Sequence, residues 1–284
     1  MAHCINEALP EEVFGVIFEE HAKLEWKAPL TNGQVCHQWR QMILCSPHAW
    51  AHLQIDQDFT SAPSKLHQWL DRLGSAPLHI RAFIWTQGVE EVLNQHCKRI
   101  QSISLYDHSL PFLENRLFPI LQSLTIDPRS IRPPVIPPVI CWSTYSTMPE
   151  LRSFRAHHIS MGALPSTIFP PLRVLTLTMV NDCDYIIRHS SYSLTSLMLD
   201  RLSLQYTSES LDFPSLRFLS LYIVKNVKHQ MNVPALTMYH ESDRMERESF
   251  PMSLPSLIEY GIYRFVDNSH FNVTQLHQCY PNIS

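Results

Sequence analysis

The chain has little glycine and no paired cysteine motif, and both absences restrict the chemistry that it can carry. Only 6 of its 284 residues are glycine. Phosphate-cradling turns therefore have few places to form, and the sequence contains neither a phosphate loop nor a nucleophile elbow. The 7 cysteines are isolated, without a Cys-x-x-Cys pair. An odd number of scattered cysteines is typical of reduced thiols and indicates neither a zinc site nor a disulfide framework.

Long apolar runs and clusters of basic residues are also missing. No apolar stretch reaches the ~18 residues that a membrane span needs, and the acidic motif that begins close to Met1 does not fit a signal peptide. The formal net charge is −4 and the pI is near 6.4, and the lysines and arginines form no runs, which argues against a nucleic-acid or membrane partner. We therefore expect a cytoplasmic or nuclear protein whose partners are other proteins.

The 16 histidines form no recognisable catalytic or metal-binding motif. There is no His-Glu-x-x-His, and His157 and His158 are neighbours in a predicted strand, where adjacent side chains point to opposite faces. Cys36 lies beside His37, but it falls on the apolar stripe of a predicted helix, which favours packing over a role as nucleophile. The sequence thus predicts a non-catalytic protein without a metal or cofactor.

Residues 9–53 contain two predicted amphipathic helices. Pro10 and the two glutamates after it are typical of a helix start, and the apolar stripe that follows is Val13, Phe14, Ile17 and Phe18. The second helix has Thr31 or Asn32 as cap candidates and Pro47 as its stop. Its stripe is Val35, Cys36, Trp39, Met42 and Ile43. Two helices of about three turns bury little against each other, so apolar surface remains for a partner.

The order of these residues resembles the F-box. The matching positions are Leu9-Pro10, Glu11-Glu12, Val13 to Phe18, Val35-Cys36, Trp39-Arg40, Ser46-Pro47 and Trp50. The resemblance implies docking on a Skp-family adaptor, and through it on a cullin scaffold, by Leu9, Pro10, Val13, Ile17, Leu30, Val35, Cys36, Trp39 and Trp50. Asn32 stands where the family usually has an apolar residue, which predicts one weaker contact with the adaptor. The residues alone leave open a second interpretation, an N-terminal helical hairpin that packs on the main body.

The rest of the chain repeats a Leu-x-x-Leu-x-Leu pattern. The first apolar residues of the copies are Ile100, Leu121, Leu151, Leu172, Leu194, Leu216, Leu236 and Leu257, which gives spacings of 21, 30, 21, 22, 22, 20 and 21 residues. This period is typical of leucine-rich repeats, and the alternating pairs within each copy, such as Leu175 and Leu177, should point inward. A proline stands two residues before the first apolar residue in six copies, at Pro119, Pro149, Pro170, Pro214, Pro234 and Pro255. We expect these prolines to mark strand starts, and the apolar residues beside them, Phe118, Phe169, Phe213, Val233 and Leu254, to cap the column between turns.

Between the two regions, Ser64 and Gly74 bound a predicted helix, a short strand should follow through Leu78 and Ile80, and a further helix should run from Val89 to Cys97. The order Trp-Leu-x-Arg-x-Gly-Ser-x-Pro-Leu after an F-box resembles the expanded fungal F-box families. We therefore expect an α/β protein with an F-box at 5–55, a helical transition and first degenerate repeat at 56–99, and an irregular leucine-rich-repeat solenoid at 100–284 with a parallel sheet on its concave face. The proline-rich loop at 128–149 is either a tolerated insertion or an arm that contacts a substrate.

Residues that alternate with the leucines should face solvent on the concave sheet. Most are small and polar; those with the side chains to anchor a target protein are Tyr106, Asp127, Arg155, His157, Asp200, Phe218 and Tyr222. The other possibility is that loops or a terminal segment cover some of them. The resemblance and the repeats together predict a substrate-recognition subunit of an SCF-type cullin-RING ubiquitin ligase. The alternative is an interaction scaffold that binds the adaptor without ubiquitin transfer.

Overall fold

The protein is an α/β fold built on one curved parallel sheet. The computed structural model describes residues 9–61, 63–106, 110–114, 116–127, 147–161, 170–202, 211–222, 224, 231–242 and 256–263. Within these residues it has seven α-helices and a ten-stranded sheet of order β1-β2-β3-β4-β5-β6-β7-β9-β11-β12, in which every pairing is parallel. The parallel sheet that the sequence predicts is therefore present.

The helices and strands have the following bounds. The helices are α2 (Glu11–Leu24), α3 (Ala28–Asn32), α4 (His37–Leu44), α5 (Gln57–Ser61), α6 (Pro63–Leu73), α7 (Gln87–Asn94) and α8 (Asp184–Ser190), with 3-10 turns η1 (Pro47–Trp50), η2 (Cys97–Arg99) and η3 (Leu110–Leu113). The strands of the large sheet are β1 (His52–Ile55), β2 (Leu78–Ala82), β3 (Ile100–Leu105), β4 (Ser123–Ile126), β5 (Ser153–His157), β6 (Val174–Thr178), β7 (Ser196–Asp200), β9 (Phe218–Tyr222), β11 (Met238–Ser242) and β12 (Glu259–Tyr263). A separate pair is formed by β8 (Leu211–Asp212) and β10 (Met231–Asn232).

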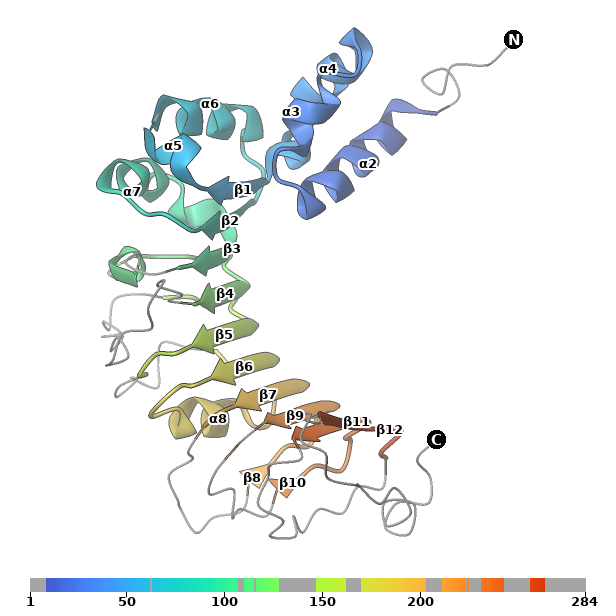
Figure 1. The fold of residues 1–284 in the computed structure, drawn as a ribbon, viewed down its shortest axis with the longest axis vertical. Coiled ribbons are helices and arrows are strands. Elements are labelled where there is room, and N and C mark those ends of the chain that lie inside the picture. Colours follow the sequence, from blue (N-terminus) through green and yellow to red (C-terminus); the bar gives the residue numbers. More distant parts are fainter. Residues whose placement is uncertain are drawn as a thin grey trace, which may run out of the picture.

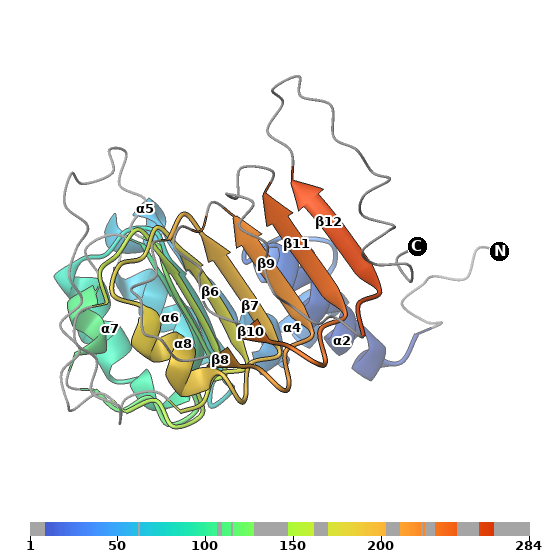
Figure 2. The ribbon, with the colours of Figure 1, turned by 90° about the horizontal axis from the view of Figure 1, so that it is seen from below.

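The strands stack along an arc, and the helices divide between its two sides. Figure 1 shows α5, α6, α7 and α8 on the outer, convex side of the arc, and α2 on the inner side at the β1 end. Figure 2, seen from below, shows the later strands running side by side with α8 on one side of them. Among the described helices, those on the outer face cover the core, and α2 lies on the inner side only at the β1 end.

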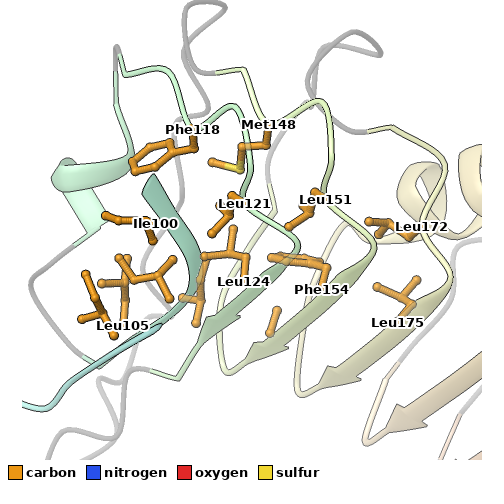
Figure 3. Packing of buried hydrophobic residues seen from close by; sticks show 14 of the residues in the cluster. Ile100, Leu105, Phe118, Leu121, Leu124, Met148, Leu151, Phe154, Leu172 and Leu175 are labelled. Atoms are coloured by element: carbon orange, nitrogen blue, oxygen red, sulfur yellow. The ribbon is translucent and has the colours of Figure 1, made fainter. Parts of the chain in front are cut away.

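Alternation along each strand builds that core. Figure 3 shows the buried side chains of successive copies stacked in rows, with Leu124, Phe154 and Leu175 in one row and Leu121, Leu151 and Leu172 in the next. The pairs expected to point inward, from Ile103 and Leu105 to Leu219 and Leu221, are all at most 1 % exposed. At roughly 1.5 to 3 kcal/mol for each fully buried large apolar side chain, each copy supports its neighbours although no single copy could fold alone.

Four of the repeated prolines, Pro119, Pro149, Pro214 and Pro234, lie in turns, and the expectation that they mark the first residues of strands is wrong; Pro255 lies outside the described residues. Pro119 is four positions before β4, and the Leu121 N–H donates to the Phe118 carbonyl at 3.3 Å. That bond closes a β-turn with proline at its second position, where a fixed φ near −65° fits. Equivalent bonds recur at 148–151, 213–216 and 233–236. The residue before the proline is buried, as expected for Phe118, Phe213 and Val233; Phe169 and Leu254 lie outside the described residues.

The opposite ends of three strands turn through left-handed residues that are not glycine. His158, Met179 and Arg201 follow β5, β6 and β7 directly and have φ values of 49°, 51° and 50°. Their N–H groups still donate to the next strand, as Met179 does to the Asp200 carbonyl at 2.8 Å. Backbone hydrogen bonds therefore hold these corners. Asn and Gly adopt the left-handed conformation with the least strain, but neither recurs at these positions, so the residues there are strained.

The transition region matches its predicted elements and adds one strand. Helix α6 ends before Gly74, whose φ of 58° is the left-handed conformation typical of a helix C-terminus, and β2 lies where it was expected. The next expected helix is α7, but it ends at Asn94, and Cys97 begins the separate 3-10 turn η2. The sequence did not predict β1, which follows η1 after one residue and pairs with β2. The N-terminal helices therefore lead straight into the sheet. Of the proline-rich loop, 128–146 lies outside the described residues.

Candidate functional site

The first candidate surface lies on the N-terminal helices, and its position follows from what α2 buries. Phe14 and Phe18 are at most 2 % exposed, and their rings pack against Trp39 of α4 at 5.6 and 5.4 Å between centroids. The Val13 N–H donates to the Pro10 carbonyl at 3.1 Å, so the helix begins directly after the proline. One stripe of α2 is thus used inside the protein, and its other apolar residues have to face elsewhere.

Those other residues are exposed. On α2 they are Val13 at 39 % and Ile17 at 44 %, preceded by Leu9 at 37 %. The further expected contacts Pro10, Leu30 and Val35 are also exposed, and Trp39 and Cys36 are partly covered. We call the set Leu9, Val13, Ile17, Leu30 and Val35 the apolar module face. Sequence reasoning missed Val16 (60 %), which is three residues after Val13 and so beside it, and Leu24 (88 %), which lies two turns beyond Ile17 at the end of α2.

Trp50 is not part of this surface, and its expected contact with an adaptor is wrong for this structure. Its side chain is 2 % exposed, its indole N–H donates to the Ile43 carbonyl at 3.0 Å, and its ring meets that of Trp69 edge-on at 4.8 Å. The indole N–H of Trp69 in turn donates to the Trp50 carbonyl at 2.9 Å. Trp50 therefore joins the N-terminal helices to α6 and the sheet, because an indole that finds both a hydrogen-bond partner and aromatic neighbours gains most from burial.

The start of the second helix also differs from expectation. Thr31 and Asn32 were the cap candidates, but they end the separate short helix α3, and α4 begins after Cys36. The Cys36 Sγ accepts the Trp39 N–H at 3.5 Å, so this residue caps the helix and does not lie on its apolar stripe. Arg40 stabilises the segment between α3 and α4, because its Nε donates to the Gly33 carbonyl at 2.9 Å.

Asn32 is internal, so the predicted loss of one adaptor contact does not follow from it. It is 7 % exposed, and its Oδ1 lies 3.2 Å from the His21 Nδ1 of α2. A buried amide with a partner of this kind is satisfied. Asn32 therefore ties α3 to α2 and leaves the apolar module face unchanged.

The second candidate surface is the inner face of the sheet, where parallel register aligns side chains in rows. The middle row runs Gln54, Arg81, Ser104, Thr125, Arg155, Thr176, Met198, Ser220, His240 and Gly261. Arg155 is exposed, as expected, while Phe218 and Tyr222 are half-buried. Ser220 is 4 % exposed, contrary to the expectation that it faces solvent. The rings of Phe218 and His240 meet edge-on with their centroids 5.4 Å apart, so a side chain of the neighbouring strand β11 covers part of Phe218.

Besides Phe218, four of the expected target-binding residues, Asp127, His157, Asp200 and Tyr106, have partners inside the protein. Asp127 is 6 % exposed, and its Oδ1 is 3.5 Å from the Nδ1 of His157. Its expected role as an exposed anchor is therefore wrong, because little of the carboxylate is accessible. Asp200 forms an ion pair with Arg201 at 3.3 Å, and Tyr106 stacks on Phe83 at 4.6 Å.

A cleft of about 300 Å³ lies where the end of α2 approaches β1, β2 and β3. Its lining includes the rings of His52 and His79, which stack at 4.6 Å with an 8° angle between their planes. Burial, followed by the nearby His79, lowers the pKa of His52 to about 4, and burial also lowers the pKa of His79. Both rings are therefore neutral at pH 7. Sequence reasoning missed this pair, because its members meet only through the register of two strands.

The described residues contain no group of three or more His, Cys, Asp or Glu side chains arranged to hold a metal. Burial raises the pKa of the Cys183 thiol to about 12 and also raises that of Cys97. These thiols remain protonated at pH 7, and the thiolate is the reactive form. In the same part of the chain, no helix is long and apolar enough to cross a membrane.

Comparison with known proteins gives no relative. No protein-family model, no curated protein and no solved structure matches this chain. The case for a function therefore rests on the two surfaces described above.

Proposed function

We propose that this protein is a substrate-recognition subunit of an SCF-type cullin-RING ubiquitin ligase, present in the cytoplasm or nucleus. In this proposal residues 9–53 form an F-box that binds a Skp-family adaptor. The later strands form an irregular leucine-rich-repeat solenoid that holds a target protein. The observation that carries the proposal is the apolar module face, on helices whose other side is already packed.

Two properties of this face support adaptor binding. First, Val13 and Ile17 are one turn apart on α2, at ~100° around the helix from Phe14 and Phe18, and both are exposed among the residues that the structure describes. Second, the exposed apolar side chains belong to α2, α3 and the segments beside them, and exposed apolar side chains on short helices are typical of a surface that a partner helix covers. The order Leu-Pro, Trp-Arg and Ser-Pro-x-x-Trp in the same residues adds the resemblance to the F-box.

The sheet supports the second half of the proposal. Its inner face is curved, open and lined mainly by small polar side chains, which is the form of surface that stacked repeats offer to protein partners. The mechanism is one of proximity: the receptor breaks no bond, but it raises the effective concentration of a target lysine near a charged ubiquitin-conjugating enzyme. In this mechanism no residue of this chain takes part in a covalent step.

Co-purification with a Skp-family adaptor tests the first half. The Val13→Glu, Ile17→Glu double variant places two charges on the apolar module face without touching the core, so it should fold and lose the adaptor. Ile258→Glu is the matched control, because Ile258 is an exposed apolar residue at 64 % at the far end of the sheet. Adaptor retained by the double variant, or lost equally by the control, contradicts the proposal.

Ubiquitin transfer requires a separate measurement, because a scaffold that only binds the adaptor would pass the first test. The expected result is that a target bound by this chain is degraded in a cullin-dependent manner, and that the Val13→Glu, Ile17→Glu variant protects it. A target whose lifetime does not change when the cullin is removed would leave only the scaffold function.

A further inference from the structure

Two arginines of the inner face lie in one row with hydroxyl side chains between them. The register pairs Arg81 of β2 with Ser104, Ser104 with Thr125, and Thr125 with Arg155 of β5. Both arginines are exposed, and neither guanidinium group has an ion-pair or hydrogen-bond partner among the residues that the structure describes. We call these four residues the arginine row. Two unpaired guanidinium groups on one open face provide ten N–H donors for a negatively charged ligand.

The surroundings do not neutralise this charge. On the inner face of the sheet, the middle row and the row before it contain no carboxylate from β1 to β6. These positions are His52, Gln54, His79, Arg81, Ser102, Ser104, Ser123, Thr125, Ser153, Arg155, Val174 and Thr176. Asp127, in the next row, is buried against His157. Two further acidic residues, the half-buried Asp200 and the exposed Glu259, belong to β7 and β12 and lie beside Arg201 and His240.

The end of α2 and the segment after it carry charges of both signs. Lys23, which lines the cleft beside Arg81, forms ion pairs with Glu19 at 3.3 Å and Glu20 at 2.7 Å. The Glu25 carboxylate, on the same wall, accepts the backbone N–H of Lys27 at 3.1 Å, a bond that leaves its negative charge in place. The α2 wall of the cleft is therefore acidic, and the positive charge on the sheet beside it is carried by Arg81 and Arg155.

We propose that the arginine row binds an extended acidic peptide segment of the target protein, with two carboxylates four residues apart. Arg81 and Arg155 are three strand spacings apart, or about 14 Å at ~4.8 Å for each spacing. In an extended peptide, residues i and i+4 point the same way and lie about 13 Å apart at ~3.3 Å per residue. The two lengths match when the peptide crosses the strands, and the residue at i+2 then faces the hydroxyls of Ser104 and Thr125.

The cleft at the β1 end extends this site beyond Arg81. Its volume of about 300 Å³ is bounded by His79, Ser102 and Ser104 on the sheet and by Trp26 after α2. This volume is large enough for an uncharged flanking side chain of the peptide, and the hydroxyl and imidazole groups of the lining offer further hydrogen bonds. This assignment rests on the proposed function for its biological setting, but binding of the peptide by the isolated chain does not depend on the adaptor.

Fluorescence anisotropy of the full chain with synthetic peptides tests the inference. The probe is a rhodamine-labelled twelve-residue Ser/Gly peptide with glutamates four residues apart. The comparison peptides have the two glutamates adjacent, two lysines at the original positions, or two phosphoserines there. The glutamate peptide with a spacing of four should bind at least about tenfold more tightly than the adjacent-glutamate and lysine peptides, because only its carboxylates reach both guanidinium groups.

Variants locate the site. Arg81→Gln and Arg155→Gln should each weaken binding of the spaced glutamate peptide about tenfold or more, and the double variant should abolish the preference for spacing. Arg217→Gln is the matched control, because Arg217 is an exposed arginine that precedes β9 and lies outside the row; it should leave binding unchanged.

Three outcomes overturn the inference. They are equal binding of the glutamate and lysine peptides, loss of binding in Arg217→Gln alone, and binding of the phosphoserine peptide without binding of the glutamate peptide, which assigns the row to a phosphorylated segment instead. Adaptor co-purification of the same arginine variants separates the two proposals. Intact adaptor binding with lost peptide binding supports both, whereas peptide binding without any adaptor binding by the wild-type chain overturns only the proposed function.

Discussion

Trp50 provides a sharp test of how the N-terminal helices join the sheet. If it belonged to the adaptor surface, Trp50→Ala would change stability by only a few tenths of a kcal/mol. The structure instead buries it, with an indole N–H bond to the Ile43 carbonyl, the edge of Trp69 against its ring, and the guanidinium of Arg72 4.7 Å from its ring centroid. Removal of a buried Trp typically costs about 3 to 5 kcal/mol, and the carbonyl left without its donor adds about 1 kcal/mol.

We therefore expect Trp50→Ala to lower the free energy of unfolding by about 4 kcal/mol or more, measured by urea denaturation followed by circular dichroism. Since a loss of this size could unfold the protein, Trp50→Phe is the second variant. Phe keeps an aromatic ring but not the N–H, so it should lower the free energy of unfolding by about 1 to 2 kcal/mol. Val35→Ala is the surface control and should change it by less than about 0.5 kcal/mol, because Val35 is 60 % exposed. A loss below about 1 kcal/mol for Trp50→Ala would refute the reasoning.

Two other perturbations have defined outcomes. The pKa of His52 is lowered to about 4 in the folded protein and is near 6.5 when unfolded; the unfolded state therefore binds more protons between these values, and stability should fall as the pH drops from about 6.5 to about 4. Because the ring is only partly buried, we expect a loss of about 1 to 2 kcal/mol in urea titrations at pH 7 and pH 4.5; His52→Gln should remove this component, and an unchanged pH dependence in the variant would contradict it. Met179, with a φ of 51° at the end of β6, should become less strained as glycine, so Met179→Gly should raise the free energy of unfolding by about 0.5 kcal/mol, whereas Thr178→Gly inside the strand should lower it by about 0.5 to 1 kcal/mol. Equal destabilisation by the two changes in thermal denaturation would show that the left-handed conformation stores no strain.

The elements predicted correctly are those whose signals are local. The Leu-x-x-Leu-x-Leu pattern predicted strands β3 to β7 and β9 with the right buried pairs, since side-chain alternation depends only on position within a strand. Gly74 marked the end of α6 because its positive φ is a local requirement. The prolines, by contrast, recur at a regular spacing but lie at the second position of turns and not at strand starts. The fixed φ of proline fits both kinds of position, so the sequence does not distinguish them.

The elements that were missed depend on contacts between distant parts of the chain. Trp50 resembles an exposed anchor in sequence, and only the approach of α6 shows that its ring is enclosed. Asn32 looked like a polar residue on an apolar surface until its amide was seen beside His21, eleven residues earlier. His52 and His79 stack because β1 pairs with β2, and β1 itself was not predicted. Periodicity cannot supply such pairings, because it does not specify which elements meet.

The central claim is that the apolar module face, and not the inner face of the sheet, binds a Skp-family adaptor. The most direct measurement is hydrogen–deuterium exchange of the full chain with and without a purified adaptor. Adaptor binding at the apolar module face should slow exchange within α2 to α4 (Glu11–Leu44) and leave exchange in β4 to β9 unchanged. Protection confined to the strands, or no protection anywhere with a folded chain, would contradict it.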